Sequence, residues 1–204
     1  MMKNTKAKPP VAIKIPTELE KHNDVRVDNY FWMRLSDDQK LAPVKDEQTQ
    51  NVVDFLEAEN EYYNQVTGYT KDFQEQLFQE MKGRIKEDDA SVPYKSNGYF
   101  YITRFEIGNQ YPIYSRKKGT LEAEEEILFN VNEYAKGFDY FQLGGLNVSP
   151  NNKLAIFATD TVSRRQYFLR IKNLETGEIY KDIIDNTTGG SVWANDNKTI
   201  FYTK

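Results

Sequence analysis

The stretch Val148-Ser-Pro-Asn-Asn-Lys-Leu-Ala-Ile-Phe157 is echoed at an offset of 44 residues by Val192-Trp-Ala-Asn-Asp-Asn-Lys-Thr-Ile-Phe201. Valine, asparagine, isoleucine and phenylalanine recur at the paired positions 148/192, 151/195, 156/200 and 157/201. In each copy a polar turn separates two short runs, and the spacing leaves room for four short strands. A repeat of about 40 to 50 residues that holds four strands is typical of a β-propeller blade. Because two copies are few, two similar hairpins of a β-sandwich remain the alternative.

Strand patterns surround this repeat throughout the second half of the chain. After Gly98, side chains alternate between two faces up to Phe105, a turn follows at 107–110, and a second strand is predicted at 111–116. This pattern predicts a hairpin. No helical stripe of useful length interrupts the further strands, which are predicted at 127–131, 143–148, 154–160, 167–173, 179–184, 191–194 and 199–203.

The first half of the chain has the helical period instead. One apolar stripe follows a 3.6-residue repeat at Val52, Phe55, Leu56, Tyr62, Tyr63 and Val66. Gly68 is predicted to close that helix and Thr70 to cap the next one. The second helix carries an apolar face of its own and is predicted to end at Gly83; that face consists of Phe73, Leu77, Phe78 and Met81. The preceding segment 25–34 is rich in aromatic residues but too irregular for a helix.

A charged seam separates the two patterns. Six of the eight residues in 82–89 are charged, and Ser91-Val-Pro93 then leads into the first strand. We therefore predict a helical domain at 1–85 and a β-propeller domain at 86–204. At the observed spacing the second domain holds two to three blades, whereas propellers have about four to eight. The chain is accordingly predicted to be a fragment, with an open strand edge.

Composition narrows the functional classes. The 204 residues include 39% hydrophobic residues, enough for a core, and carry a net charge of −4 with no basic face, so nucleic acid is not an expected partner. No segment is apolar enough to span a membrane, and the polar start 1–10 lacks the apolar run of a signal peptide. We expect a cytoplasmic protein. The absence of cysteine excludes disulfides and thiolate chemistry. Three glycosylation-type motifs, at Asn147, Asn186 and Asn197, are interpreted as turns.

No group of residues carries a recognisable catalytic pattern. The string Gly189-Gly-Ser-Val-Trp193 lacks the last glycine of a nucleophile elbow and is interpreted as a turn. His22 is the only histidine and is expected at a surface turn. The acidic runs 87–89 and 122–126 are interpreted as a solvated connector and a solvated turn. Arg164-Arg165 is interpreted as a hairpin tip, with contact to an acidic partner as the alternative. We therefore assign no catalytic, cofactor-binding or metal-binding residue, and expect no cofactor.

Six strings occur in order over nearly the whole chain. They are Arg26-Val-Asp-Asn-Tyr-Phe-Trp-Met-Arg34, Leu56-Glu-Ala-Glu-Asn60, Met81-Lys-Gly-Arg-Ile-Lys-Glu-Asp-Asp89 with Ser91-Val-Pro93, Tyr111-Pro-Ile-Tyr114, Arg164-Arg-Gln-Tyr167 and Trp193-Ala-Asn-Asp196. Together they resemble the prolyl oligopeptidase family of serine peptidases. Asp28-Asn-Tyr30 favours the oligopeptidase B (protease II) branch over the prolyl-specific one. One departure is Asn23, which stands after His22 where the family has glycine and which can adopt the same left-handed conformation.

This resemblance implies an α+β fragment: an N-terminal helical extension of an α/β-hydrolase domain, followed by the first two to three blades of a seven-bladed β-propeller. It also implies a peptidase that cleaves short peptides after Arg or Lys with a Ser-Asp-His triad, while the propeller restricts substrate access. The triad belongs to the C-terminal catalytic domain of the same polypeptide, so the 204-residue chain alone is expected to be inactive.

Two further expectations concern partners. The natural partners implied are the C-terminal catalytic domain and peptide substrates, and self-association of the fragment is expected through the helical arm or the open strand edge. The alternative is a non-enzymatic protein–protein interaction module with a propeller-like β domain. A nucleophile elbow followed by Asp and His in the downstream reading frame would favour the peptidase, and a stop codon after Lys204 would favour the module.

Overall fold

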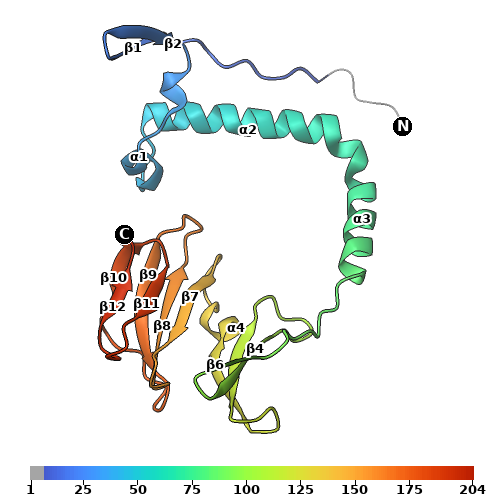
Figure 1. The fold of residues 1–204 in the computed structure, drawn as a ribbon. Helices are drawn as coiled ribbons and strands as arrows, with labels where there is room; N and C mark the ends of the chain where they lie inside the picture. Colours follow the sequence, from blue (N-terminus) through green and yellow to red (C-terminus); the bar gives the residue numbers. More distant parts are fainter. Residues whose placement is uncertain (1–6) are drawn as a thin grey trace. The chain divides into compact units, whose positions relative to one another are not determined.

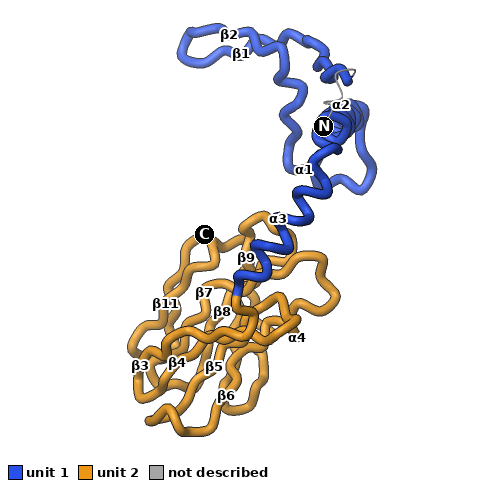
Figure 2. Tube along the Cα trace, turned by 90° about the vertical axis from the view of Figure 1, so that its right-hand side faces the viewer, with its two compact units in different colours: residues 1–85 blue, residues 86–204 orange. Residues whose placement is uncertain are grey.

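The computed structural model describes residues 7–204, which divide between Ile85 and Lys86 into two compact units (Figure 2). Most of the polar start 1–10 therefore lies outside the described residues. The division falls inside the charged seam 82–89. The first unit is mainly helical and the second mainly β-sheet. The domain identities given above to these two parts remain predictions.

The first unit opens with a hairpin that the sequence analysis did not predict. Strand β1 (Thr17–Lys21) pairs with β2 (Asp24–Asp28) in antiparallel register (Figure 1). His22 and Asn23 form the turn with φ angles of 55° and 62°. Two consecutive left-handed residues match the turn that two-residue hairpins favour, and asparagine adopts this conformation readily. The expectation that Asn23 can replace glycine here and that His22 lies in a surface turn is confirmed.

A short 3₁₀ turn, η1 (Phe31–Met33), and two helices follow. Helix α1 (Asp37–Leu41) starts with a capping box between Ser36 and Gln39. Helix α2 (Glu47–Thr67) starts at Asp46, whose carboxylate accepts a hydrogen bond of 2.7 Å from the amide of Thr49. Hydrogen bonds from Thr49 and Gln39 lower the pKa of Asp46. The charged form thus fits the positive end of the helix dipole.

Two details at the joint between the long helices differ from the prediction. Gly68 keeps a right-handed conformation, with φ of −54°, so the chain continues into the 3₁₀ turn η2 (Gly68–Thr70) rather than stopping. Thr70 does not cap helix α3 (Lys71–Gly83): its hydroxyl donates a 2.7 Å hydrogen bond to the carbonyl of Thr67 instead. Because Thr70 has helical φ and ψ, its side chain faces the preceding turn and cannot reach the free amides of α3.

The predicted apolar face of α3 is exposed. Phe73, Phe78 and Met81 have exposed fractions of 56%, 57% and 65%. Helix α3 contains no buried residue, and in α2 only Thr49 and Val52 are buried. An amphipathic helix gains most of its stability from burying such a face. Self-association through this face therefore stays a prediction with a physical basis.

The second unit consists of antiparallel sheets in which consecutive strands are neighbours. Two sheets have four strands each, in the orders β3-β4-β5-β6 and β10-β9-β8-β7, and a two-stranded hairpin β11-β12 follows them (Figure 1). A single helical turn, α4 (Val131–Tyr134), links the first two sheets. The strands are β3 (Tyr94–Ser96), β4 (Tyr99–Arg104), β5 (Ile113–Lys118), β6 (Glu125–Asn130), β7 (Gln142–Val148), β8 (Leu154–Asp160), β9 (Tyr167–Asn173), β10 (Ile184–Thr187), β11 (Ser191–Trp193) and β12 (Ile200–Tyr202).

Strand β8 lies between two cores. Ala155 and Phe157 pack with residues of the first sheet, whereas Ile156 and Ala158 pack with Trp193 and Ile200 of the β11-β12 hairpin and with partners in β9 and β10. Adjacent residues of a strand point to opposite faces, so a strand covered on both sides is apolar without interruption. The sheets therefore stack face to face, as neighbouring propeller blades do. That seven of them close a ring stays a prediction.

The repeat that suggested blades is real, but its register is one residue longer than the sequence alignment indicated. The backbone amide of Asn152 donates a hydrogen bond to the carbonyl of Ser149, and the backbone amide of Asn197 donates one to the carbonyl of Ala194. Asn152 and Asn197 are also the left-handed residues of their turns, with φ of 63° and 59°. Both pairs are 45 residues apart. The alignment at 44 matched residue types, whereas the backbone hydrogen bonds of the turn define the equivalent positions.

Asp196 orders the second copy of this turn. Its carboxylate accepts hydrogen bonds from the hydroxyl and amide of Thr199, at 2.6 and 2.8 Å, and from the amide of Lys198 at 2.9 Å. These bonds, led by that of the Thr199 hydroxyl, lower the pKa of Asp196 from 3.8 to about 2. The folded state therefore favours the charged carboxylate.

A depressed pKa fixes the sign of the pH dependence. The stabilisation by Asp196 is present in full above its ordinary pKa of 3.8 and is lost as pH falls through about 2. We expect the amide proton shift of Thr199 to titrate with a midpoint near pH 2, measured by two-dimensional NMR. Asp196→Asn should abolish this titration while leaving other carboxylates unchanged. A midpoint at the ordinary value would contradict the hydrogen-bonded arrangement.

One predicted strand is misplaced. The sequence predicted a strand at 179–184, but in this segment only Ile179 forms an isolated bridge, to Lys172, and β10 begins at Ile184. The ladder to β9 is irregular between Ile184 and Thr187, where the Thr187 hydroxyl donates a 3.0 Å hydrogen bond to the carbonyl of Tyr167. A buried side-chain hydrogen bond thus fixes the outer strand later in the chain than its apolar residues indicate.

Candidate functional site

A cavity of about 250 Å³ lies between the first sheet and strand β7. No charged side chain lines it, and such a volume is smaller than that of a typical ligand pocket. Its lining contains no histidine, so no base could activate a hydroxyl nucleophile there. The cavity can hold water or a small neutral group. It is lined by Tyr94, Ser96, Asn97, Tyr101, Ile102, Thr103, Tyr114, Ser115, Leu128, Leu146, Asn147 and Val148.

A buried arginine joins the two sheets beside this cavity. The Arg116 side chain is only 4% exposed and forms two hydrogen bonds of 2.8 Å with the carboxylate of Glu126. Its guanidinium stacks on Tyr99 at 4.1 Å from the ring centre and donates a 3.1 Å hydrogen bond to the carbonyl of Asn152 in the second sheet. Burial alone would lower the pKa of Arg116, but Glu126 raises it overall. The arginine therefore stays charged and spans the interface.

Two more polar contacts cross the same interface. The side-chain amide of Asn152 donates a 3.1 Å hydrogen bond to the backbone carbonyl of Asn97. This bond joins the turn between β7 and β8 to the turn between β3 and β4. The Lys172 ammonium donates a 2.7 Å hydrogen bond to the carbonyl of Leu128 and lies 4.6 Å from the ring centre of Phe129. Burial lowers the pKa of Lys172. Arg116 and Lys172 were not predicted, because nothing in their sequence neighbourhood distinguishes them from surface cations.

A similar tie connects the second sheet to the β11-β12 hairpin. The side-chain amide of Asn147 donates a 2.8 Å hydrogen bond to the backbone carbonyl of Ser191. The Trp193 indole donates a 3.0 Å hydrogen bond to the backbone carbonyl of Asn147. The interpretation of Asn147 as a turn residue is therefore wrong: it lies in β7. Asn186 has a positive φ angle but lies in β10, so its interpretation as a turn residue is wrong as well. Asn197 lies in the turn between β11 and β12 with a positive φ angle, as predicted.

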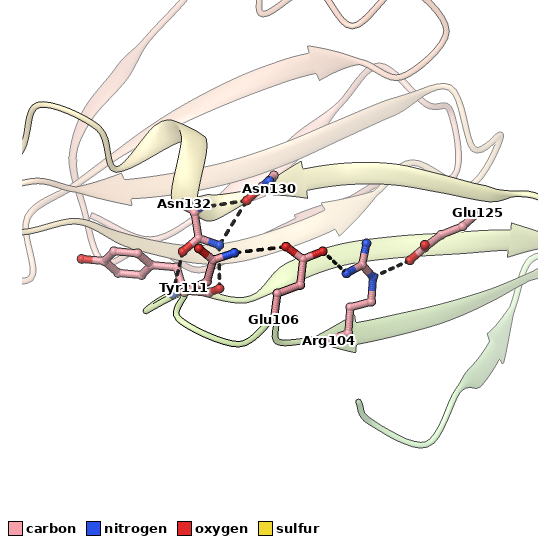
Figure 3. Close-up of polar contacts among 7 residues, drawn as sticks. Arg104, Glu106, Tyr111, Glu125, Asn130 and Asn132 are labelled. Carbon is pink, nitrogen blue, oxygen red and sulfur yellow. Dashed lines mark hydrogen bonds and ion pairs between the residues drawn. The ribbon is translucent and has the colours of Figure 1, made fainter. Parts of the chain in front are cut away.

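The acidic run 122–126 is only in part the solvated turn that was predicted, because Glu122 and Glu124 alone lie exposed in the turn before β6. Glu125 and Glu126 are the first residues of β6, and each pairs with an arginine. Figure 3 shows Arg104 between Glu106 and Glu125, at 2.6 and 2.9 Å. Partial burial raises the pKa of Glu125, but the hydrogen bond from Arg104 and the charge of Arg104 lower it overall. Two glutamates of the run thus pair with arginines of β4 and β5.

A second part of this network holds the loop before β5. In Figure 3 the Asn132 side chain faces Tyr111, accepting a 2.9 Å hydrogen bond from its amide and donating one of 2.8 Å to its carbonyl. Asn130 accepts hydrogen bonds from the backbone and side chain of Asn132. The contacts satisfy backbone groups and leave no reactive group at the centre. These contacts therefore hold the loop before β5 in place.

The other predicted residues lie apart. Gly189 lies in the link between β10 and β11 with φ of 87°, as expected of a turn, and Ser191 is the first residue of β11. Neither lies in the unit that contains His22. Within residues 7–204, no three His, Cys, Asp or Glu side chains gather where they could hold a metal ion. None of the described helices is both long and apolar enough to cross a membrane.

Comparison with known proteins identifies the family to which this chain belongs. Residues 9–204 match the family model described as prolyl oligopeptidase, N-terminal beta-propeller domain. Dipeptidyl aminopeptidase BI of Pseudoxanthomonas mexicana is 36% identical over 96% of this chain and 27% of its own length. Protease 2 of Moraxella lacunata is 30% identical over 95% of this chain and 28% of its own length. The chain thus spans about a quarter of the length of these relatives.

The solved structures agree with the sequence comparison. Oligopeptidase B from Leishmania major superposes with a TM-score of 0.77 and 26% identity, over 92% of this chain and 28% of that protein. The stacked sheets, the ordered strings and the family model all point to the same group. The chain therefore belongs to the prolyl oligopeptidase family, in the region that its N-terminal β-propeller domain occupies.

Proposed function

We propose that this chain is the N-terminal region of a serine oligopeptidase that hydrolyses short peptides after Arg or Lys. The observation that carries the proposal is the family match over residues 9–204, together with the likeness to oligopeptidase B. In this proposal the stacked sheets belong to a seven-bladed propeller that restricts access to folded proteins. Helices α2 and α3 belong to an extension of the catalytic domain.

The chemistry in this proposal lies outside the 204 residues. Acyl transfer by a serine nucleophile needs a histidine base within hydrogen-bond reach. His22, in the β1-β2 turn, is the only histidine of the sequence, and no Gly-x-Ser-x-Gly elbow occurs. The partners proposed for the chain are therefore a catalytic domain of the same polypeptide and peptide substrates. We further propose a cytoplasmic location for this activity.

The test compares the 204-residue chain with the full-length protein on fluorogenic peptides that end in Arg, Lys, Glu or Leu before the reporter. We expect the full-length protein to cleave the Arg and Lys peptides and to lose this activity to a serine-directed inhibitor, while the short chain gives no turnover. A dipeptide-releasing substrate with a free N-terminus serves as the control, because one relative is named a dipeptidyl aminopeptidase. Preference for that substrate would reject the proposed specificity.

A further inference from the structure

The turn between β3 and β4 contains the single Asn-Gly dipeptide of the sequence, Asn97-Gly98. Both residues have left-handed φ angles, of 45° and 82°, as a two-residue hairpin turn favours. Both are also exposed. Within residues 7–204, neither the side chain of Asn97 nor the backbone amide of Gly98 forms a hydrogen bond. The two groups that can react with each other in an Asn-Gly pair are therefore both free.

An exposed Asn-Gly pair can cyclise without a catalyst. The Gly98 nitrogen attacks the side-chain carbonyl carbon of Asn97, and ammonia leaves, so that a succinimide ring forms. Water then opens the ring at either carbonyl, and the product is aspartate or isoaspartate. Glycine permits this attack best, because no side chain stands beside the attacking nitrogen. At Gly98 even an added Cβ would meet nothing within 4 Å, so the ring has room to form.

Cyclisation requires the turn to leave its left-handed conformation briefly, and the surrounding structure makes this opening cheap. Strand β3 is the edge strand of its sheet, and all three of its residues are exposed. Segments with few buried contacts open locally at a low free energy. Tyr94, Ser96 and Asn97 also line the cavity of about 250 Å³, so packed atoms do not confine them on that side. The end of this hairpin can therefore move without unpacking the core.

The corresponding turns of the next two sheets are better protected. Asn152 and Asn197 also have left-handed φ angles, but a lysine rather than a glycine follows each of them. The side-chain amide of Asn152 donates its hydrogen bond to the carbonyl of Asn97. The side-chain oxygen of Asn197 accepts a 2.7 Å hydrogen bond from the backbone amide of Asn151. Of these three asparagines, Asn97 alone combines a free side chain with a following glycine.

We propose that Asn97 is a site of spontaneous deamidation, and that this modification loosens the contact between the two four-stranded sheets. The carbonyl of Asn97 accepts the 3.1 Å hydrogen bond from Asn152 that joins their turns. In isoaspartate this carbonyl leaves the main chain as a free carboxylate, and the main chain of the turn gains a methylene group. Because the length of a hairpin turn fixes the register, the longer turn disturbs the pairing of β3 with β4. The proposal does not depend on the proposed function.

The experiment ages the full-length protein in warm, mildly alkaline buffer and follows the tryptic peptide Ser96–Arg104 by mass spectrometry. We expect this peptide to convert progressively to products in which a hydroxyl replaces the side-chain amino group, and isoaspartyl methyltransferase should methylate one of them. The peptides that contain Asn152 and Asn197 should stay unmodified over the same period. Asn97→Gly is the matched control, because glycine keeps the left-handed turn and cannot deamidate.

Amide hydrogen exchange tests the consequence for the sheets. Exchange in β3 and in the turn between β7 and β8 should become faster as the wild type ages, and should stay constant in Asn97→Gly. An unmodified Ser96–Arg104 peptide in the aged native protein would overturn the proposal, and ageing of the urea-unfolded chain would show whether the folded turn protects Asn97. Deamidation without faster exchange would contradict the loosening of the contact. Neither readout uses peptidase activity, so the proposed function is tested separately.

Discussion

Replacing Gly145 by alanine is expected to destabilise the second unit by about 3 kcal/mol, from left-handed strain and a backbone clash together. Gly145 has φ of +57°, and a Cβ there would stand 1.9 Å from the carbonyl oxygen of Gly189. No side-chain rotation can relieve this contact, because the atom belongs to the backbone. The inner strand β7 and the link between β10 and β11 would have to move apart. That movement would open the packing of Tyr167, whose ring lies against both Gly144 and Gly189.

Gly177→Ala separates the two contributions. Gly177 also has a left-handed conformation, with φ of +78°, but nothing lies within 4 Å of the added Cβ. Backbone strain alone should destabilise this variant, and we expect its free energy of unfolding to fall by about 1 to 2 kcal/mol. Urea unfolding of both variants, followed by near-ultraviolet circular dichroism, measures the difference. Equal losses in the two variants would mean that β7 does not approach the Gly189 link as closely as the structure has it.

The close approach at Gly145 also shows where sequence reasoning stopped. Two adjacent glycines inside a predicted strand indicate a bulge or a close backbone contact. The strand at 143–148 was predicted, and the structure has it with a shift of register between Gly144 and Asn147. The partner across the contact, Gly189, lies in a separate link of the chain. A single sequence has no information on which distant backbone segment approaches a glycine.

The repeat was predictable in period and not in register. Matching residue types gave an offset of 44, while the turn hydrogen bonds at Ser149 and Ala194 give 45. A shift of one residue moves every side chain of a strand to the opposite face. Apolar residues on both faces of β8 hid this error, because either register places apolar residues on each side. The family assignment does not depend on the register of the repeat, because it rests on the ordered strings of residues.

The polar ties between sheets were the least predictable feature. Arg116 and Lys172 lie in strands that alternate normally, and only the neighbouring sheet makes them buried. Likewise, Glu126 was interpreted as part of a solvated turn because charge runs usually are. The hairpin β1-β2 was missed because its strands are short and almost fully exposed. The brief alternation at Val25-Arg-Val27 was interpreted as part of the irregular segment 25–34.

Removing Glu126 is expected to destabilise the second unit more than removing Arg116, although the two residues form one ion pair. The Arg116 side chain is 4% exposed, whereas that of Glu126 is 40% exposed. Loss of the glutamate leaves a buried charge without its partner. Loss of the arginine leaves a carboxylate that water can reach. A fully buried charge left unpaired costs about 3 to 5 kcal/mol, and partial solvent access lowers the expected cost of Glu126→Ala to about 2 kcal/mol.

Arg116→Met keeps the length of the side chain and removes the charge. It gives up the stacking on Tyr99 and the hydrogen bond to the Asn152 carbonyl, but it creates no buried charge. Replacing a buried ion-pair member by an apolar group of similar volume then costs less, and we expect about 1 kcal/mol, the value of one such hydrogen bond. Arg116→Met combined with Glu126→Ala should be no less stable than Glu126→Ala alone.

Glu125→Ala is the matched control, because Glu125 is the adjacent residue of β6 and pairs with the more exposed Arg104. Water screens that pair, so its loss should cost less than about 1 kcal/mol. Urea unfolding of the four variants gives the comparison. If Glu125→Ala and Glu126→Ala lower the free energy of unfolding by the same amount, the buried guanidinium of Arg116 would not depend on the carboxylate of Glu126. The two sheets would then be held together by their apolar core and by the contact between Lys172 and the Leu128 carbonyl.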